Sequence, residues 1–248
     1  MNYLFNNNES NENIILIVSC GRRFEQLKST INKLCEHNPQ ISNEIKKCWV
    51  LDDRSTSEDR KKIDILFKKH FKDNYNSVNF NSEKPYYYVN KLNFIKKISD
   101  ASDIILYLED DWECCKPLNL TDHVNILKNQ NVDSICLTGL KMIQYDHILK
   151  QEQKYKNYWK NPWPCYYKSL TNYTPDEIHM YHWAEVRMKN WSNNPSLVKA
   201  KVFHQGFFKN YSHYEVFFAD KFCQQVNQFF TDSPYFYHIG DEKSLERN

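Results

Sequence analysis

The sequence is short of several features that would assign it to particular classes of protein. It has no apolar run near the ~18 residues that a membrane-spanning helix needs. Its first residues lack the basic and then apolar segments of a signal peptide. Its 33 basic and 31 acidic residues leave a formal net charge of only +2, so bulk charge attracts it neither to nucleic acid nor to a membrane surface. We therefore expect a cytoplasmic protein with no nucleic-acid partner and no membrane span.

Paired metal-binding cysteines are absent, and glycine is scarce. None of the eight cysteines forms a CxxC pair, which argues against a structural zinc site. Only four glycines occur, so each is a candidate for a backbone position that other residues tolerate poorly. The chain does have apolar content: 41% hydrophobic residues over 248 positions suffice for one core. Lysine pairs such as Lys61-Lys62 and Lys68-Lys69 alternate with apolar residues and are typical of solvated helix faces. We expect one domain over residues 1–248.

Apolar patterns alternate between those of strands and those of helices in the first half of the chain. Continuous apolar runs predict strands, and apolar residues at intervals of three and four predict amphipathic helices. The predicted strands are 14–18, 48–51, 78–80 and 103–108, and the predicted helices are 24–34, 57–70 and 89–99. Such alternation is typical of an α/β fold with a mostly parallel sheet flanked by helices.

Polar residues follow three of these predicted strands directly. They are Ser19-Cys20-Gly21, Asp52-Asp53 and Glu109-Asp110-Asp111. Because the carboxyl ends of parallel strands meet at one edge of a sheet, where ligands of such folds bind, we expect the three clusters to converge.

The pattern changes after about residue 117. Residues 134–138 predict another strand, and residues 213–226 and 235–237 predict a helix and a short strand. Between them, residues 155–183 are dense in aromatics and have no clean period, which favours a loop-rich wall of a cleft. We therefore divide the domain into a first half, 13–116, which carries the three polar clusters, and an aromatic-rich second half, 117–248.

The acidic triplet Glu109-Asp110-Asp111 is the clearest chemical signal. A divalent cation that bridges a diphosphate needs hard oxygen ligands on a rigid support, with positions left open for phosphate oxygens. Acidic residues at the end of a buried strand meet that need. The alternative is a solvated turn at a strand end, but the apolar run before the triplet and Trp112 after it favour a site.

Four segments together resemble the GT-A glycosyltransferases, particularly the family-2-like enzymes, including those of large DNA viruses. They are residues 17–23 (IVSCGRR), 50–55 (VLDDRS), 108–112 (LEDDW) and 238–240 (HIG). The middle two are fairly specific as a pair, whereas the outer two are weak alone. The resemblance spans almost the whole chain and implies a GT-A, Rossmann-like fold with a nucleotide-sugar-binding half, 13–116, and an acceptor-binding half, 117–248. For a viral enzyme it also implies a place in the host cytoplasm.

The resemblance also implies roles for residues of the donor site. Ser19 is expected to contact the nucleotide, with Arg22 or Arg23 near the phosphates. Asp53 is expected to hydrogen-bond the base, and Asp110 the ribose.

A second group of residues is implied around the cofactor, Mn²⁺ or Mg²⁺. Asp111 is the expected ligand, Glu109 is the first member of the DxD-like triplet, and His238 is expected to complete the metal or diphosphate site. The alternative for His238 is a strand-end histidine satisfied by backbone. Lys91, on the predicted helix before the acidic strand, is a further candidate for the donor, although a solvated surface lysine is the more favoured interpretation.

The catalytic base is expected in the C-terminal half. An inverting transfer needs a carboxylate to deprotonate the acceptor hydroxyl. Glu215 opens the predicted apolar helix and is the first choice, although Ser212 three residues earlier makes a capping box an alternative explanation. Asp220 is second, and weaker candidates are Asp176, Glu177 and Glu185.

The predicted function is therefore transfer of a sugar, with inversion, from a nucleotide-diphosphate donor to a hydroxyl of a glycan or glycoconjugate. A UDP-sugar is favoured as donor, and retaining chemistry stays open. One alternative is a sugar-1-phosphate nucleotidyltransferase, which normally needs a more glycine-rich loop after the first strand than residues 19–23 provide. Another is a catalytically dead carbohydrate-binding module, against which the intact acidic triplet argues.

Overall fold

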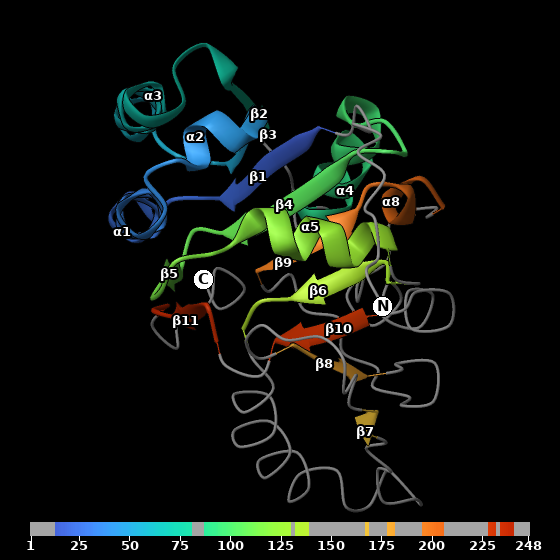
Figure 1. Cartoon of the computed structure of the whole chain (residues 1–248). Helices are drawn as coiled ribbons and strands as arrows, with labels where there is room; N and C mark the ends of the chain where they lie inside the picture. Colours follow the sequence, from blue (N-terminus) through green and yellow to red (C-terminus); the bar gives the residue numbers. More distant parts are fainter. Residues whose placement is uncertain are drawn as a thin grey trace, which may run out of the picture.

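The computed structural model describes residues 13–80, 87–129, 132–138, 167–168, 178–181, 195–205, 228–231 and 234–240. Within these ranges lie a nine-stranded sheet of order β3-β2-β1-β4-β9-β6-β10-β8-β7 and a two-stranded sheet of order β11-β5 (Figure 1). Helices flank the large sheet, and its strands run mostly in one direction. The expected α/β architecture is confirmed.

The first part of the large sheet alternates strands and helices as the apolar patterns predict. Its elements are β1 (Ile14–Cys20), α1 (Phe24–His37), α2 (Ile41–Glu44), β2 (Ile45–Asp53), α3 (Ser57–Phe71), a 3₁₀ turn (Lys72–Asn74), β3 (Tyr75–Phe80), α4 (Tyr87–Ile98) and β4 (Ile104–Glu109). Every strand and helix expected between residues 14 and 108 is present. Strand β1 pairs in parallel with β2 on one side and with β4 on the other.

Helices cover both faces of this parallel part (Figure 1). Leu16 and Val18 of β1 belong to the core that contains the buried residues of α1 and α3. Ile15 and Ile17 belong to the opposite core, with the buried residues of α4 and of the short helix α8 (Lys201–Gln205). Burial on both faces explains why β1 is a continuous apolar run rather than an alternating one.

The second part of the chain extends the sheet and adds the small one. Its elements are β5 (Trp112–Cys114), α5 (Leu120–Asn129), β6 (Ser134–Cys136), β7 (Tyr167–Lys168), β8 (Ile178–Tyr181), β9 (Ser196–Lys199), α8, β10 (Gln228–Thr231) and β11 (Phe236–His238). Strand β9 lies between β4 and β6 and is antiparallel to both, and β8 is antiparallel to β10. The remaining strands of the large sheet share one direction.

The expectations for this second part have different outcomes. The strands predicted at 134–138 and 235–237 are present as β6 and β11, the latter one residue later. The short strands β7 and β8 lie in the aromatic stretch expected to be rich in loops. The helix predicted at 213–226 lies outside the described residues. The division at residue 117 stays a prediction, and β9 joins the sheet of the first half directly.

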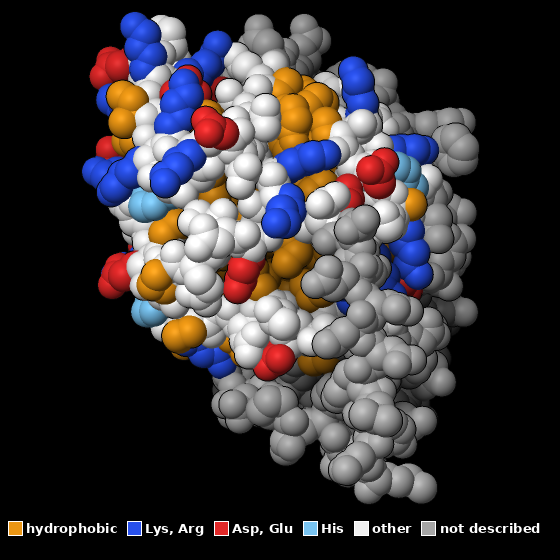
Figure 2. Space-filling view, turned by 45° about the horizontal axis from the view of Figure 1, so that its top comes forward, with side chains coloured by type: hydrophobic (Ala, Val, Ile, Leu, Met, Phe, Trp, Pro, Cys, Tyr) orange, Lys and Arg blue, Asp and Glu red, His pale blue; other side chains and the backbone are white. Residues whose placement is uncertain are grey.

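Helix α3 shows how the lysine-rich stretches are used. Its outer face carries ion pairs one turn apart, Lys62 with Glu58 at 2.8 Å and Lys68 with Asp64 at 3.4 Å. Figure 2 shows basic and acidic side chains mixed over this end of the molecule. The expected solvated helix face is confirmed. Among the described residues, no helix combines the length and the apolar character that a membrane crossing requires.

Candidate functional site

The polar residues at the carboxyl ends of β1, β2 and β4, which the longer strands of the structure partly include, meet at one edge of the sheet, as predicted. In the parallel register Ser19 lies beside Leu51 of β2 and beside Glu109 of β4, and Cys20 lies beside Asp52. We call this edge the carboxyl rim. Chain segments as far apart as residues 19–23, 52–55 and 109–111 are therefore neighbours there.

Asp110 is the most deeply buried acid of the rim, with 1% of its surface exposed. Its Oδ2 accepts a hydrogen bond from the backbone N–H of Gly21 at 3.1 Å and one from Arg23 Nε at 3.3 Å. Its Oδ1 accepts a further bond from Arg23 Nη2. Burial raises the pKa of Asp110 to about 6, against the opposing effect of the Arg23 charge. The backbone carbonyl of Asp110 accepts from the hydroxyl of Thr30 on α1 at 2.9 Å, which holds the turn against that helix.

Asp111 lies between an arginine and a histidine. Its Oδ2 is 2.7 Å from Arg23 Nη1 and 3.2 Å from His238 Nε2. Burial alone would raise the pKa of Asp111, but the hydrogen bond to His238 and the charge of Arg23 outweigh it and hold the pKa below its usual range. Its Oδ1 is buried and has no hydrogen-bond partner among the described residues. A buried carboxylate oxygen without a partner is costly and calls for an explanation.

The small sheet brings His238 to Asp111. Strand β11 pairs with β5 in antiparallel register, so that His238 lies opposite Trp112, and the two rings are 4.9 Å apart. The N–H of Ile239 donates to the carbonyl of Asp111 at 2.8 Å. The predicted meeting of His238 with the acidic triplet is therefore present, and its side chain contacts a carboxylate rather than backbone.

Gly240 keeps the space around this pair open. A Cβ at this position would lie 2.6 Å from Asp111 Oδ2 and 2.8 Å from His238 Nε2, closer than real Cβ atoms approach other groups. The scarcity of glycine marked such positions as special, but the steric role of Gly240 has no signal in the sequence beyond that.

We call Asp110 and Asp111 the acidic pair. Of the two adjacent arginines, Arg22 and Arg23, only Arg23 contacts this acidic pair. Burial lowers the pKa of Arg23, but the charges of Asp110 and Asp111 outweigh it and leave the pKa raised. Arg22 has a left-handed backbone with φ of 57°, and its exposed side chain donates from Nε to the carbonyl of Arg54 at 3.3 Å. The turn thus sends the two side chains to different partners.

Lys91 is buried, so the favoured interpretation of it as a solvated surface lysine was wrong. It is 6% exposed, and its ammonium donates to Ser19 Oγ at 2.7 Å and to the carbonyl of Cys20 at 3.4 Å. Helix α4 packs on the sheet at the point where β1 ends, which brings this side chain into the rim. The structure therefore places Lys91 next to the predicted nucleotide contact.

Asp52 and Asp53 differ in their surroundings. Asp52 accepts a hydrogen bond from Ser55 Oγ and lies 3.4 Å from Arg60 Nε, while Ser55 Oγ accepts from the backbone N–H of Arg22 at 3.1 Å. Asp52 therefore ties the loop after β2 to the loop after β1, a structural role that the sequence did not reveal. Asp53 is buried at the rim, with one oxygen 4.0 Å from Arg54 Nε.

The fit to a divalent cation rests on Asp111 and His238. Their contacting atoms are 3.2 Å apart, close to the ~3.0 Å between neighbouring ligands of an octahedral ion with bonds of about 2.1 Å. The partnerless Oδ1 of Asp111 adds a hard oxygen. Within the described residues no third His, Cys, Asp or Glu side chain joins them in a cluster that could hold a metal, so the assignment of Glu109 as a ligand stays a prediction. The pair fits a cation that completes its coordination with phosphate oxygens or water.

The predicted catalytic acids lie outside the described residues. This holds for Glu215 and Asp220, and equally for Asp176, Glu177 and Glu185. The choice of base stays a prediction.

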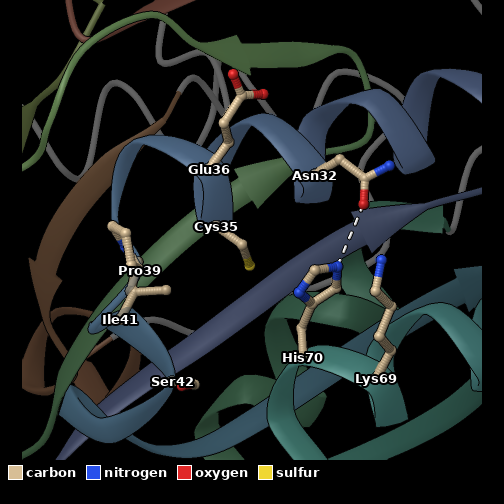
Figure 3. Close-up of a pocket in the computed structure, with 8 residues that line it drawn as sticks. All are labelled: Asn32, Cys35, Glu36, Pro39, Ile41, Ser42, Lys69 and His70. Atoms are coloured by element: carbon tan, nitrogen blue, oxygen red, sulfur yellow. Dashed lines mark hydrogen bonds between the residues drawn. The ribbon is translucent and has the colours of Figure 1, made fainter.

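A pocket of ≈ 340 Å³ lies away from the rim (Figure 3). It is formed where α1 and α3 end and where α2 begins, at the amino end of the parallel strands. Its lining includes Cys35, Lys69 and His70, and the His70 ring contacts Asn32 at 3.2 Å. No predicted donor-site residue lines it, and burial raises the pKa of the Cys35 thiol to about 11, so this thiol is not an activated nucleophile.

The fold is similar to that of several solved glycosyltransferase structures. The mannosyltransferase PcManGT from Pyrobaculum calidifontis, in complex with GDP-Man and Mn²⁺, superposes with a TM-score of 0.61 at 9% identity over 96% of this chain. TarS of S. aureus superposes with a TM-score of 0.59 at 13% sequence identity over 92% of this chain. GalNAc-T7 with UDP, GalNAc and Mn²⁺ superposes with a TM-score of 0.59 at 12% identity over 94% of this chain. The matched parts are 60%, 37% and 45% of those three chains, respectively.

These likenesses show that the fold is that of GT-A glycosyltransferases. At this level of identity they show the fold alone, and they carry nothing about a viral source. No protein-family model matches the sequence, and no curated protein matches it.

Proposed function

We propose that this protein is a metal-dependent glycosyltransferase that moves a sugar from a nucleotide-diphosphate donor to a hydroxyl of a glycan or glycoconjugate, with inversion. One observation carries the proposal: Asp111 and His238, far apart in sequence, meet at 3.2 Å on the carboxyl rim of a GT-A sheet. Ligands of open α/β sheets bind at that rim. Two of the similar structures hold a nucleotide or nucleotide sugar together with Mn²⁺.

In this proposal each residue of the rim binds one part of the donor. Ser19 would contact the nucleotide and Lys91 the donor beside it, Asp53 would bind the base and Asp110 the ribose, while Arg23 would bring a permanent positive charge to the diphosphate side. Asp111 and His238, with Glu109 as the further candidate, would hold Mn²⁺ or Mg²⁺, and the bound ion would supply positive charge to the departing diphosphate. The carboxylate of Glu215, or else of Asp220, would take the proton of the acceptor hydroxyl.

A thermal-shift panel tests the central claim. UDP-, GDP- and dTDP-sugars are added with and without Mn²⁺ to wild type, Asp111→Ala and Asp111→Asn. We expect one nucleotide family, with UDP favoured, to raise the melting temperature of the wild type only when Mn²⁺ is present. Both variants should lose that response, the isosteric one included, because the charged oxygen is the ligand.

If no nucleotide sugar stabilises the wild type, the proposed function is wrong. If Asp111→Asn responds as the wild type does, the metal site is wrongly placed. The anomeric configuration of the product, read by NMR, then separates inversion from retention.

A further inference from the structure

The guanidinium of Arg23 occupies the place where a cation is expected. It contacts Asp111 Oδ2 through Nη1 at 2.7 Å, and it holds Asp110 through Nε at 3.3 Å and through Nη2. The same Asp111 oxygen also faces His238 Nε2 at 3.2 Å. One oxygen of the expected metal ligand therefore already has two nitrogen partners.

Space on the remaining side of that oxygen is small. The Cα of Gly240 lies so near that a single added carbon would be 2.6 Å from Asp111 Oδ2. A divalent ion on this oxygen would also lie directly beside the guanidinium, and like charges in a partly buried site repel strongly. Arg23 and a metal ion held between Asp111 and His238 cannot both keep full contact with Oδ2 of Asp111, the oxygen that faces His238.

We propose that Arg23 is a built-in counter-ion of the acidic pair, that it competes with the divalent cation for Asp111, and that it moves to the donor diphosphate when the cation binds. The inference rests on the proposed function, since it concerns how the same site accepts its metal.

The asymmetry of the contacts makes this exchange feasible. Asp110 receives two of the three guanidinium contacts and is the more buried acid, with 1% of its side chain exposed against 8% for Asp111. Arg23 can therefore give up Asp111 and stay anchored on Asp110. The freed Nη1 then has a hydrogen-bond donor to offer to a diphosphate oxygen, which a guanidinium binds well. Without a ligand, the same arginine neutralises two carboxylates that would otherwise repel each other.

Arg22 supplies the matched control. It is adjacent, carries the same charge and has its Nε on the carbonyl of Arg54 rather than on an acid. Arg22→Gln thus lowers the net charge as much as Arg23→Gln does, without removing a contact to the acidic pair.

The test is binding of Mn²⁺ alone, followed by the electron paramagnetic resonance signal of the free ion, with no nucleotide present. We expect Arg23→Gln to bind Mn²⁺ about tenfold more tightly than wild type, because the competing cation is gone. Arg22→Gln should bind like wild type, and Asp111→Asn should lose binding. An unchanged or weaker affinity in Arg23→Gln would overturn the exchange, as would an equal gain in Arg22→Gln.

A second measurement, made on the wild type, tests the exchange even if Arg23→Gln does not fold. In protein with ¹⁵N-labelled arginine, the Arg23 Nε signal, assigned by its loss in Arg23→Lys, should shift on addition of diamagnetic Mg²⁺. An Arg23 signal that stays in place while Mg²⁺ binds refutes the exchange. If wild type binds Mn²⁺ through Asp111 but Arg23→Gln gains nothing, only the exchange fails. If neither wild type nor Arg23→Gln binds Mn²⁺, the proposed metal site is wrong as well as the exchange.

Discussion

Charged side chains at the carboxyl rim and charged side chains on the outer helices are arranged in opposite ways. In the rim pair between Arg23 and Asp110, the side chains are 21% and 1% exposed. In the pair between Lys62 and Glu58 on α3, they are 45% and 78% exposed. Both pairs are ion pairs within hydrogen-bond distance, but only the first is withdrawn from water.

The difference matters because burial of charge is costly. An exposed ion pair keeps most of its hydration and contributes little to stability, whereas a buried one gives up hydration that its own attraction repays only in part. The raised pKa of Asp110, about 6, records that cost at the rim. Perturbed ionisable groups that cluster in this way are typical of functional sites. The comparison therefore favours the rim, rather than the helix faces, as the place where a ligand is expected to bind.

The largest effect is expected from Gly240→Ala. The added methyl carbon would lie 2.6 Å from Asp111 Oδ2 and 2.8 Å from His238 Nε2, so the pair must separate. We expect the affinity for nucleotide in the presence of Mn²⁺ to fall about 10- to 100-fold, the usual effect of disturbing a metal ligand's support. Isothermal titration calorimetry measures it. Tyr237→Ala is the control, because that side chain lies on β11 next to His238 but is 48% exposed. Equal losses in both variants would mean that β11, not the contact between Asp111 and His238, had been disturbed.

The next effect is expected from Lys91→Met, which replaces a buried ammonium by an apolar chain of similar length. Loss of one charged hydrogen bond should weaken nucleotide binding about tenfold. Ser19→Ala and the double variant complete a cycle, since Lys91 Nζ and Ser19 Oγ are 2.7 Å apart. If Lys91 contacts the donor itself, Lys91→Met still weakens binding in the Ser19→Ala background. A change in unfolding free energy with unchanged nucleotide affinity would assign Lys91 to the fold alone.

The sequence predicts the parallel part of the molecule well, for a physical reason. Strands buried on both faces need continuous apolar runs, and residues 14–18 and 104–108 show them clearly. Once those strands are parallel, their ends must meet, so the convergence of Ser19 with Glu109 follows. Strand β9 had no such signal. Its four residues pair with β4 and β6, and no local pattern in Ser196–Lys199 indicates which strands they pair with.

Individual roles at the rim were harder to predict. Lys91 looked solvated because lysine is seldom buried, and only the packing of α4 shows otherwise. Arg22 and Arg23 are identical neighbours, and the left-handed turn at Arg22 decides which of them reaches Asp110. His238 reaches Asp111 through the pairing of β11 with β5, a contact between residues 127 positions apart.

The smallest effect is expected from Lys62→Gln, which breaks the exposed pair with Glu58 at 2.8 Å. Because both side chains remain hydrated in either state, the melting temperature should stay within about 1 °C of wild type. Arg60→Gln on the same helix is the informative partner, since Arg60 lies 3.4 Å from the buried carboxylate of Asp52, which anchors the loop after β2. We expect a larger fall there, measured by differential scanning calorimetry. If Lys62→Gln lowers the melting temperature as much as Arg60→Gln does, then exposure does not separate the two classes of ion pair. The charged side chains of the rim would in that case contribute to stability no differently from those on the helix faces.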